Sequence, residues 1–330
     1  MLGKFVFITS SSYSGSTLLA YLLGSHSRIA TVGEARGLNV DIDPEEYDCS
    51  CGEKFLACSF WNDVARRMKS KLSPSFDLRR LNTKFVRKSS GIFDRLQFSD
   101  LRFSFLENIR DGVYGNIRPY AEYTRSVIEH NIALAESVSE YYKKDIYLDS
   151  SKTPAAITHL SKALPSAFKV IYLFRDGRAV FNSFIKRKRV SETTAIKEWI
   201  KINKFIQRKL EPLPGRDVLL VSYTDLCAQP QKTLDRIFNF IGVGYEEQCM
   251  KYWAHEHHII GNDMRLSLKR DIVQDDSWKN NLSPAQLRMF EKAGSKLNHR
   301  WNMLFSSAQA AQNCPCPPLS ERPRVGHYFA

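Results

Sequence analysis

The sequence predicts an α/β fold, in which a parallel sheet is flanked by helices and carries a mostly helical insert. The first observation is an apolar segment, residues 4–9, that leads through a Ser/Gly-rich loop into a helical pattern ending near His26. The second is a series of similar short apolar segments that read as strands, at residues 28–32, 145–149, 169–174 and 218–222. Because helical patterns separate most of these strands, right-handed crossovers and a parallel sheet are expected.

These patterns divide the chain into one large domain and a tail. Residues 1–305 are expected to form the domain, with the insert at about residues 41–144. Within the insert, residues 120–138 repeat apolar side chains at the spacing of a helix that packs on the sheet. Residues 306–330 are rich in Ser, Ala, Gln and Pro, so we expect them to be disordered.

The loop between the first strand and the first helix is built to hold an anion. A helix N-terminus offers unpaired N–H groups and a partial positive charge to a phosphate or sulfate. Against the nucleotide-binding pattern G-x-x-x-x-G-K-[ST], the loop matches at Gly15 and Thr17 but has Ser10 for the first Gly and Ser16 for the Lys. The sequence therefore predicts a P-loop-like site without its lysine. The loop alone is equally compatible with an ordinary Ser/Gly-rich turn.

A second motif follows the strand at residues 169–174. Arg175 comes at the carboxyl end of this strand, where open α/β sheets bind ligands, and Ser183 lies eight positions later on the following helix. Taken alone, Arg175 could be a structural ion-pair partner and Ser183 a helix-surface serine.

The two motifs together resemble the sulfotransferases that use 3′-phosphoadenosine 5′-phosphosulfate (PAPS), with motifs most similar to the bacterial and tyrosylprotein or carbohydrate types. The resemblance implies that the first loop binds the 5′-phosphosulfate, and that Arg175 and Ser183 bind the 3′-phosphate. The implied loop residues are Ser12, Tyr13, Ser14, Gly15, Ser16 and Thr17. Many relatives have Arg or Lys where this chain has Tyr13, which can donate a hydrogen bond but brings no charge at neutral pH.

Later segments extend the resemblance. Tyr223 lies in a strand and Y-x-D-L turn like that of the family, and Trp278 lies in a W-K-N segment that closes over the nucleotide in the family. Lys269 and Arg270 fall where relatives place basic residues near the 3′-phosphate, although such a pair is more often solvated.

Two residues are candidates for catalysis. Glu34 follows the strand at residues 28–32, and in tyrosylprotein and many bacterial sulfotransferases a Gly-Glu here supplies the general base. Lys152 follows the strand at residues 145–149 and resembles the lysine that contacts the sulfuryl group, where a cation would stabilise charge on the leaving phosphate. The alternatives are a loop carboxylate for Glu34 and a surface lysine for Lys152, with His26 as a weaker candidate base.

The resemblance thus implies transfer of a sulfuryl group from PAPS to an acceptor hydroxyl by in-line displacement, with 3′,5′-ADP as product and no metal required. Two alternatives stay open. A divergent P-loop nucleotide kinase would need magnesium and ATP, and a non-enzymatic module would bind polyanions in a salt-dependent way.

Composition constrains the partners. The net charge is +13, and residues 66–95 hold ten Lys or Arg against two Asp, in a region that reads as an amphipathic helix. This basic insert would attract an anionic acceptor, or it could meet acidic lipid or simply be solvated. The acceptor could be a small molecule, a glycan, a lipid or a peptide, while no nucleic acid is expected. No apolar run is long enough for a membrane span and no secretory signal fits, so a cytoplasmic location is expected; the oligomeric state is open.

Three of the seven cysteines lie close together in the insert. Cys49, Cys51 and Cys58 have a spacing that invites a metal or disulfide interpretation, but only three ligands are visible and no H-x₃₋₅-H partner follows. A structural clip or buried thiols is therefore favoured over zinc.

Overall fold

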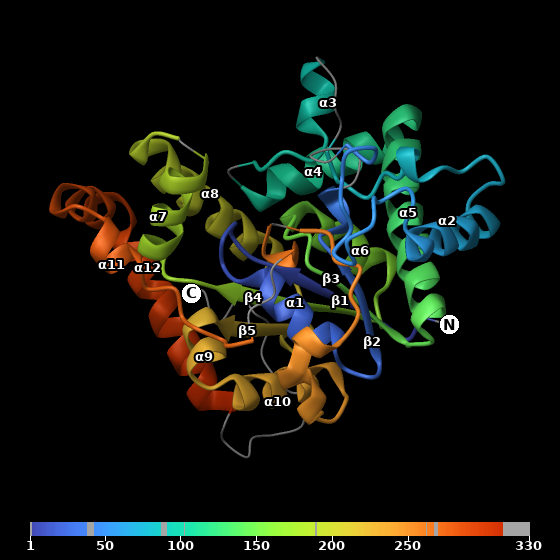
Figure 1. The fold of residues 1–330 in the computed structure, drawn as a ribbon. Helices are drawn as coiled ribbons and strands as arrows, with labels where there is room; N and C mark the ends of the chain where they lie inside the picture. The colour runs from blue at the N-terminus through green and yellow to red at the C-terminus, as the bar shows by residue number, and fades with distance from the viewer. Residues whose placement is uncertain are drawn as a thin grey trace.

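A computed structural model describes residues 2–37, 43–86, 91–101, 103–188, 190–261, 263–266 and 270–312. The strands are β1 (Lys4–Thr9), β2 (Ile29–Gly33), β3 (Ile146–Asp149), β4 (Phe168–Phe174) and β5 (Val218–Ser222). They form a parallel sheet in the order β2-β3-β1-β4-β5, with β1 at its centre (Figure 1). The predicted α/β class with a P-loop-like parallel sheet is confirmed.

Helices bury both faces of the sheet, because alternate strand residues point to opposite sides. On one face Val6 and Ile8 pack with α1 (Ser16–Gly24), α9 (Tyr223–Ala228) and α10 (Pro230–Ile241). On the other face Phe5 and Phe7 belong to an apolar cluster to which five further helices contribute. These helices are α5 (Arg118–Tyr142), α6 (Pro154–Ala163), α7 (Gly177–Lys188), α8 (Glu192–Leu210) and α12 (Pro284–Gln312).

The insert between β2 and β3 is mostly helical, as predicted. It contains η1 (Ala35–Gly37), α2 (Ser59–Lys71), η2 (Leu78–Arg80), α3 (Ile92–Leu96), α4 (Ser104–Asn116) and α5. The helix expected over residues 120–138 lies within α5. The amphipathic helix expected across residues 66–95 is wrong, because α2 ends at Lys71 and turns follow.

The physical reason lies just beyond α2. Pro74 disfavours a helical conformation at the residue before it, and the Asp77 side chain accepts a hydrogen bond from the Arg79 N–H to start η2 instead. The apolar positions still serve the core, since Phe76, Leu78, Leu81 and Phe85 are buried, whereas Val86 is exposed.

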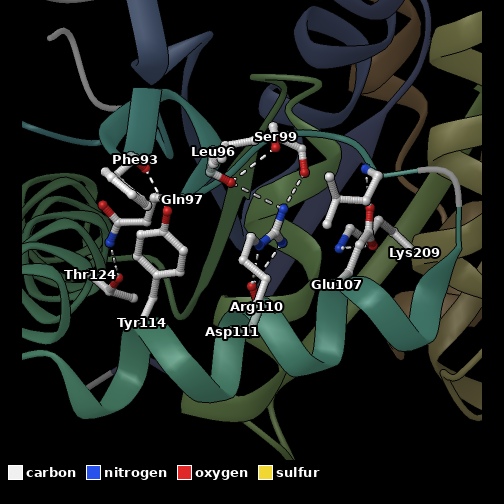
Figure 2. Close-up of polar contacts among 11 residues, drawn as sticks. Phe93, Leu96, Gln97, Ser99, Glu107, Arg110, Asp111, Tyr114, Thr124 and Lys209 are labelled. Atoms are coloured by element: carbon white, nitrogen blue, oxygen red, sulfur yellow. Dashed lines mark hydrogen bonds and ion pairs between the residues drawn. The ribbon is translucent and has the colours of Figure 1, made fainter. Parts of the chain in front are cut away.

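The middle of the insert is fastened by polar contacts (Figure 2). Lys209 of α8 and Glu107 of α4 form a buried ion pair with Nζ and Oε2 2.7 Å apart, and Glu107 Oε1 also accepts from the Leu101 N–H. Arg110 reaches from α4 to the carbonyl oxygens of Leu96 and Ser99. The insert is thereby tied to a helix that covers the sheet.

The C-terminal part completes the layers with η3 (Gly215–Asp217), η4 (Glu247–Ala254), η5 (Asp263–Leu266), α11 (Trp278–Asn281) and α12. Helix α12 continues to Gln312 and so enters the segment expected to be a tail, while residues 313–330 lie outside the described residues. Lys269 also lies outside them. Within the described part of the chain, no helix has the length and apolar character needed to cross a membrane.

Candidate functional site

The loop that joins β1 to α1 is held in a conformation suited to an anion. Helix α1 begins at Ser16, and both Gly15 (φ 89°) and Tyr13 (φ 64°) adopt the left-handed conformation that lets the chain turn sharply. Ser14 is buried, and its Oγ lies 2.7 Å from that of Ser11. The loop therefore sets the N-terminus of α1, with its unpaired N–H groups, at the carboxyl edge of the sheet.

Arg175 reaches this loop from the end of β4. Its Nη1 donates to the Tyr13 carbonyl oxygen at 2.8 Å, and its guanidinium lies 4.6 Å from the centre of the Tyr223 ring. The Tyr223 ring also packs so closely on Gly15 that a Cβ there would lie 2.5 Å from a ring carbon. Tyr223 is thus packed between the two predicted phosphate motifs, and burial raises its pKa to about 12, which keeps its hydroxyl neutral.

The Arg175 side chain is buried, and only some of its N–H groups have hydrogen-bond partners. Its Nη2 donates to the carbonyl and to the Oδ2 of Asp275, at 2.6 and 3.0 Å, whereas its Nε has no hydrogen-bond partner among the described residues. Burial disfavours ionisation of Asp275, but hydrogen bonds from Ser277 and Arg175 outweigh it and lower the Asp275 pKa. Arg175 therefore faces one carboxylate that is half exposed and keeps one buried donor unused.

Of the other residues predicted to bind the nucleotide, Ser183 lies on α7, Trp278 begins α11, and Arg270 precedes α11. Ser183 is buried, and its hydroxyl donates to the Ala179 carbonyl oxygen of the same helix at 3.0 Å, so it would have to turn this hydrogen toward a bound phosphate. The Trp278 ring lies 4.3 Å below the Arg178 guanidinium. Arg270 is exposed, so its assignment stays a prediction, as does that of Lys269.

Glu34 and Lys152 form an ion pair at the ends of β2 and β3. Lys152 Nζ lies 2.5 Å from Glu34 Oε1, and both side chains are largely buried. Lys152, three residues after the end of β3, has a positive φ of 64°, which is uncommon for a residue other than glycine. The two residues that the sequence put forward separately for catalysis are therefore in direct contact.

A distant segment fixes the backbone of Glu34. The Glu34 N–H donates to the Ile260 carbonyl oxygen at 2.8 Å, and the Ile260 N–H donates to Val32 at 2.7 Å, so residue 260 extends the sheet beyond β2. Gly33 has φ 74° and could not carry a Cβ, because it would lie 2.3 Å from the Ile260 carbonyl oxygen. This segment was not predicted from the sequence.

The same segment brings Glu34, the candidate base, close to the loop that joins β1 to α1 (the anion loop). A Cβ placed on Gly261 would lie 3.7 Å from Thr17 Oγ1 and 3.9 Å from Glu34 Oε1, so both atoms border one small space. The Tyr47 hydroxyl lies 3.2 Å from the Gly261 N, and the Arg265 guanidinium stacks on the Tyr47 ring. The carboxylate thus faces the loop that would hold a transferable group.

His26 is placed away from this site. It precedes β2, so it lies at the amino ends of the strands, at the opposite edge from Glu34. Its Nε2 lies 2.9 Å from the Gly244 carbonyl oxygen, and its Nδ1 accepts from the Arg28 N–H. The histidine caps a turn instead of competing with Glu34 as a base.

Comparison with known proteins identifies the family. Residues 6–247 match the family model described as the Sulfotransferase family, a stretch that holds the loop, Glu34, Lys152, Arg175 and Tyr223. The chain belongs to the sulfotransferase family.

Individual relatives are more distant. The chain is 27% identical to protein-tyrosine sulfotransferase A of Caenorhabditis elegans over 123 residues. This match covers 35% of the present chain and 31% of that relative. The chain therefore spans about a third of that relative's length.

Solved structures agree on the fold. The sulfotransferase domain from the curacin biosynthetic pathway matches with a TM-score of 0.50 at 16% identity, over 88% of this chain and 97% of that domain. The sulfotransferase domain from the Synechococcus PCC 7002 olefin synthase matches with a TM-score of 0.51 at 18% identity, over 88% and 94%. At these identities the likeness establishes the architecture.

Proposed function

We propose that this sulfotransferase moves a sulfuryl group from PAPS to an acceptor hydroxyl, with Glu34 as the general base. The observation that carries the proposal is the convergence of the anion loop and Arg175 on the Tyr223 ring. The two motifs are far apart in the sequence, yet their meeting point is the kind of site that a nucleotide with a phosphate at each end would require.

The donor set fits such a nucleotide. Residues 12–17 and the first N–H groups of α1 would hold the 5′-phosphosulfate. Thr9 Oγ1 and Ser10 Oγ, at the base of the loop, are buried and have no hydrogen-bond partner among the described residues, as is also true of Arg175 Nε. Arg175 and Ser183 would hold the 3′-phosphate, which would displace the half-exposed Asp275 carboxylate from the guanidinium.

PAPS supplies the activated sulfuryl group. Glu34 takes the proton of the acceptor hydroxyl as that oxygen becomes the nucleophile. Lys152 moves from the Glu34 carboxylate toward the oxygens on which negative charge develops, and stabilises that charge. The N–H groups of the loop add to this stabilisation, so the chain's own groups do the electrostatic work that a magnesium ion does in a kinase.

The acceptor is proposed to be a hydroxyl compound that reaches Glu34 past Tyr47 and Arg265. Tyr47 contacts Gly261, the Arg265 guanidinium stacks on the Tyr47 ring, and the basic insert favours an anionic acceptor. The relative named protein-tyrosine sulfotransferase A makes a tyrosine-containing peptide one acceptor to test, beside small molecules, glycans and lipids.

Two assays test the proposal together. In the first, the protein is incubated with radiolabelled PAPS and a panel of hydroxyl acceptors, and label is expected to pass to at least one class. In the second, thermal unfolding is followed with 3′,5′-ADP or with ATP and magnesium. Stabilisation by 3′,5′-ADP is expected. Stabilisation by ATP and magnesium alone would favour the kinase alternative, and salt-sensitive polyanion binding that persists in Glu34→Ala without any transfer would favour the binding module.

A further inference from the structure

The fold brings a histidine to the three cysteines of the insert. Cys49 and Cys51 lie in the loop before α2, Cys58 is the N-cap residue of α2, and His258 comes from the segment that follows η4. The three Sγ atoms and a ring nitrogen of His258 all lie within 4.8 Å of one another. Three of the four residues are buried, and Cys51 is exposed, which gives an ion a route of entry.

Three distances within this cluster are close to the edges of a zinc tetrahedron, and all of its ligand atoms lie within 4.8 Å of one another. With Zn–S near 2.3 Å and Zn–N near 2.0–2.1 Å, tetrahedral ligands lie about 3.8 Å apart for two sulfurs and about 3.6 Å apart for sulfur and nitrogen. Cys51 and Cys58 Sγ lie 3.7 Å apart, and His258 Nδ1 lies 3.3 Å from Cys49 Sγ and 3.4 Å from Cys58 Sγ. A disulfide would need two sulfurs at about 2.05 Å, and the described cysteines are free.

The surroundings orient the ligands. His258 Nδ1 faces the sulfurs while its Nε2 lies 3.1 Å from Glu256 Oε1, so the carboxylate fixes the tautomer that leaves Nδ1 free to bind a metal. The imidazole stacks on the Phe60 ring, with centroids 4.2 Å apart and planes 3° from parallel.

We propose that Cys49, Cys51, Cys58 and His258 bind one structural Zn²⁺ ion. Four protein ligands leave no open coordination position, which is typical of a structural site and not of a catalytic one. His258 could not be linked to the cysteines from the sequence, because it lies two hundred residues beyond Cys58 and in no ligand-spacing motif with it. The fourth ligand comes from folding, not from the local pattern.

The ion would fasten the segment that positions Glu34. Ser50 lies between Cys49 and Cys51 in the sequence. Its hydroxyl oxygen accepts a hydrogen bond from the Ile259 N–H at 2.7 Å and donates one to the His257 carbonyl oxygen, so this loop is already hydrogen-bonded to residues 257–259. The next residue, Ile260, pairs with Val32 and Glu34. Zinc would therefore hold together the insert and the strand-like segment beside the candidate base.

The test is the metal content of the full chain, purified under reducing conditions without chelators. Elemental analysis is expected to find about one zinc ion per chain. Replacing the zinc by Co²⁺ is expected to give the visible absorption of a tetrahedral site with thiolate charge-transfer bands. Both readouts use the unaltered protein, so they do not depend on any variant folding.

Variants then assign the ligands. His258→Ala and Cys58→Ala are expected to lower the affinity for zinc at least about tenfold, because each removes one of the four ligands, and so to lower the zinc content. Cys249→Ala is the matched control, because it removes a buried thiol outside the cluster and is expected to keep the metal. Unaltered protein that neither contains zinc nor gives the cobalt bands would overturn the proposal, as would equal metal loss in the control. None of these readouts requires sulfuryl transfer to be correct.

Discussion

Replacing Glu34 by Gln removes the candidate base while keeping its shape. The amide oxygen can still accept from Lys152 Nζ, which now lies 2.5 Å from Glu34 Oε1, so the lysine keeps a partner. A positioned general base contributes about 10²–10⁴-fold to the rate, so kcat is expected to fall by that factor, or about 3–5 kcal/mol in activation free energy. The affinity for 3′,5′-ADP is expected to change by less than about threefold, because no phosphate group is assigned to Glu34.

The assay is initial-rate transfer from labelled PAPS, combined with calorimetric titration of 3′,5′-ADP. Glu46→Gln serves as the matched control, since Glu46 is an exposed carboxylate of the same insert. Glu34→Ala adds a second comparison, because it also strips Lys152 of its partner and is expected to lose rate at least as strongly. A Glu34→Gln enzyme with an unchanged kcat would remove Glu34 from the role of base.

Other predictions concern the loop, pH and the insert. Gly15→Ala would force an alanine into a φ of 89° and place its Cβ 2.5 Å from the Tyr223 ring. Denaturation should therefore show a loss of at least about 1–2 kcal/mol in the free energy of unfolding, and calorimetry should show weaker binding of 3′,5′-ADP. Wild-type values for both would contradict the close packing. Burial raises the pKa of Asp149 from 3.8 to about 6. Because the folded state holds this proton more tightly than the unfolded state, the free energy of unfolding falls as pH rises from 3.8 to about 6, and above that range the loss is about 3 kcal/mol. Asp149→Asn should therefore be more stable than the unaltered chain at pH 7 but not at pH 4, by urea denaturation, and an equal difference at both pH values would refute this. Lys209→Met should cost about 3–5 kcal/mol by leaving Glu107 buried and unpaired, and adding Glu107→Gln should restore part of it; no recovery would count against the ion pair.

The parts of the fold that the sequence predicted are those with a local signal. Residues 4–9 and 169–174 are nearly continuous apolar runs, a pattern typical of strands that are buried on both faces of a sheet. Both segments are strands in the structure. The anion loop was visible because its small residues stand between such a strand and a helix. Arg175 could be placed at the same sheet edge because parallel strands end together.

The parts that it missed depend on contacts between distant segments. Ile260 pairs with β2 through backbone hydrogen bonds, which do not depend on the type of residue and so cannot be predicted from it. Asp275 contacts Arg175, which lies one hundred residues earlier in the sequence. The helix expected across residues 66–95 was wrong because the apolar spacing there is helical, whereas Pro74 interrupts a helix. Phe76, Leu81 and Phe85 are buried outside any helix, since irregular chain can also turn side chains into a core.

The central claim is that the anion loop and Arg175 bind the two ends of one nucleotide. Calorimetric titration of 3′,5′-ADP and of 5′-AMP into the unaltered protein and into Arg175→Met tests it most directly. A charge-assisted contact of about 1.5–3 kcal/mol predicts that 3′,5′-ADP binds roughly 10–150-fold more tightly than 5′-AMP, and that Arg175→Met removes most of this difference. Equal affinities for the two nucleotides in the unaltered protein, or a preference that survives in Arg175→Met, would contradict the claim.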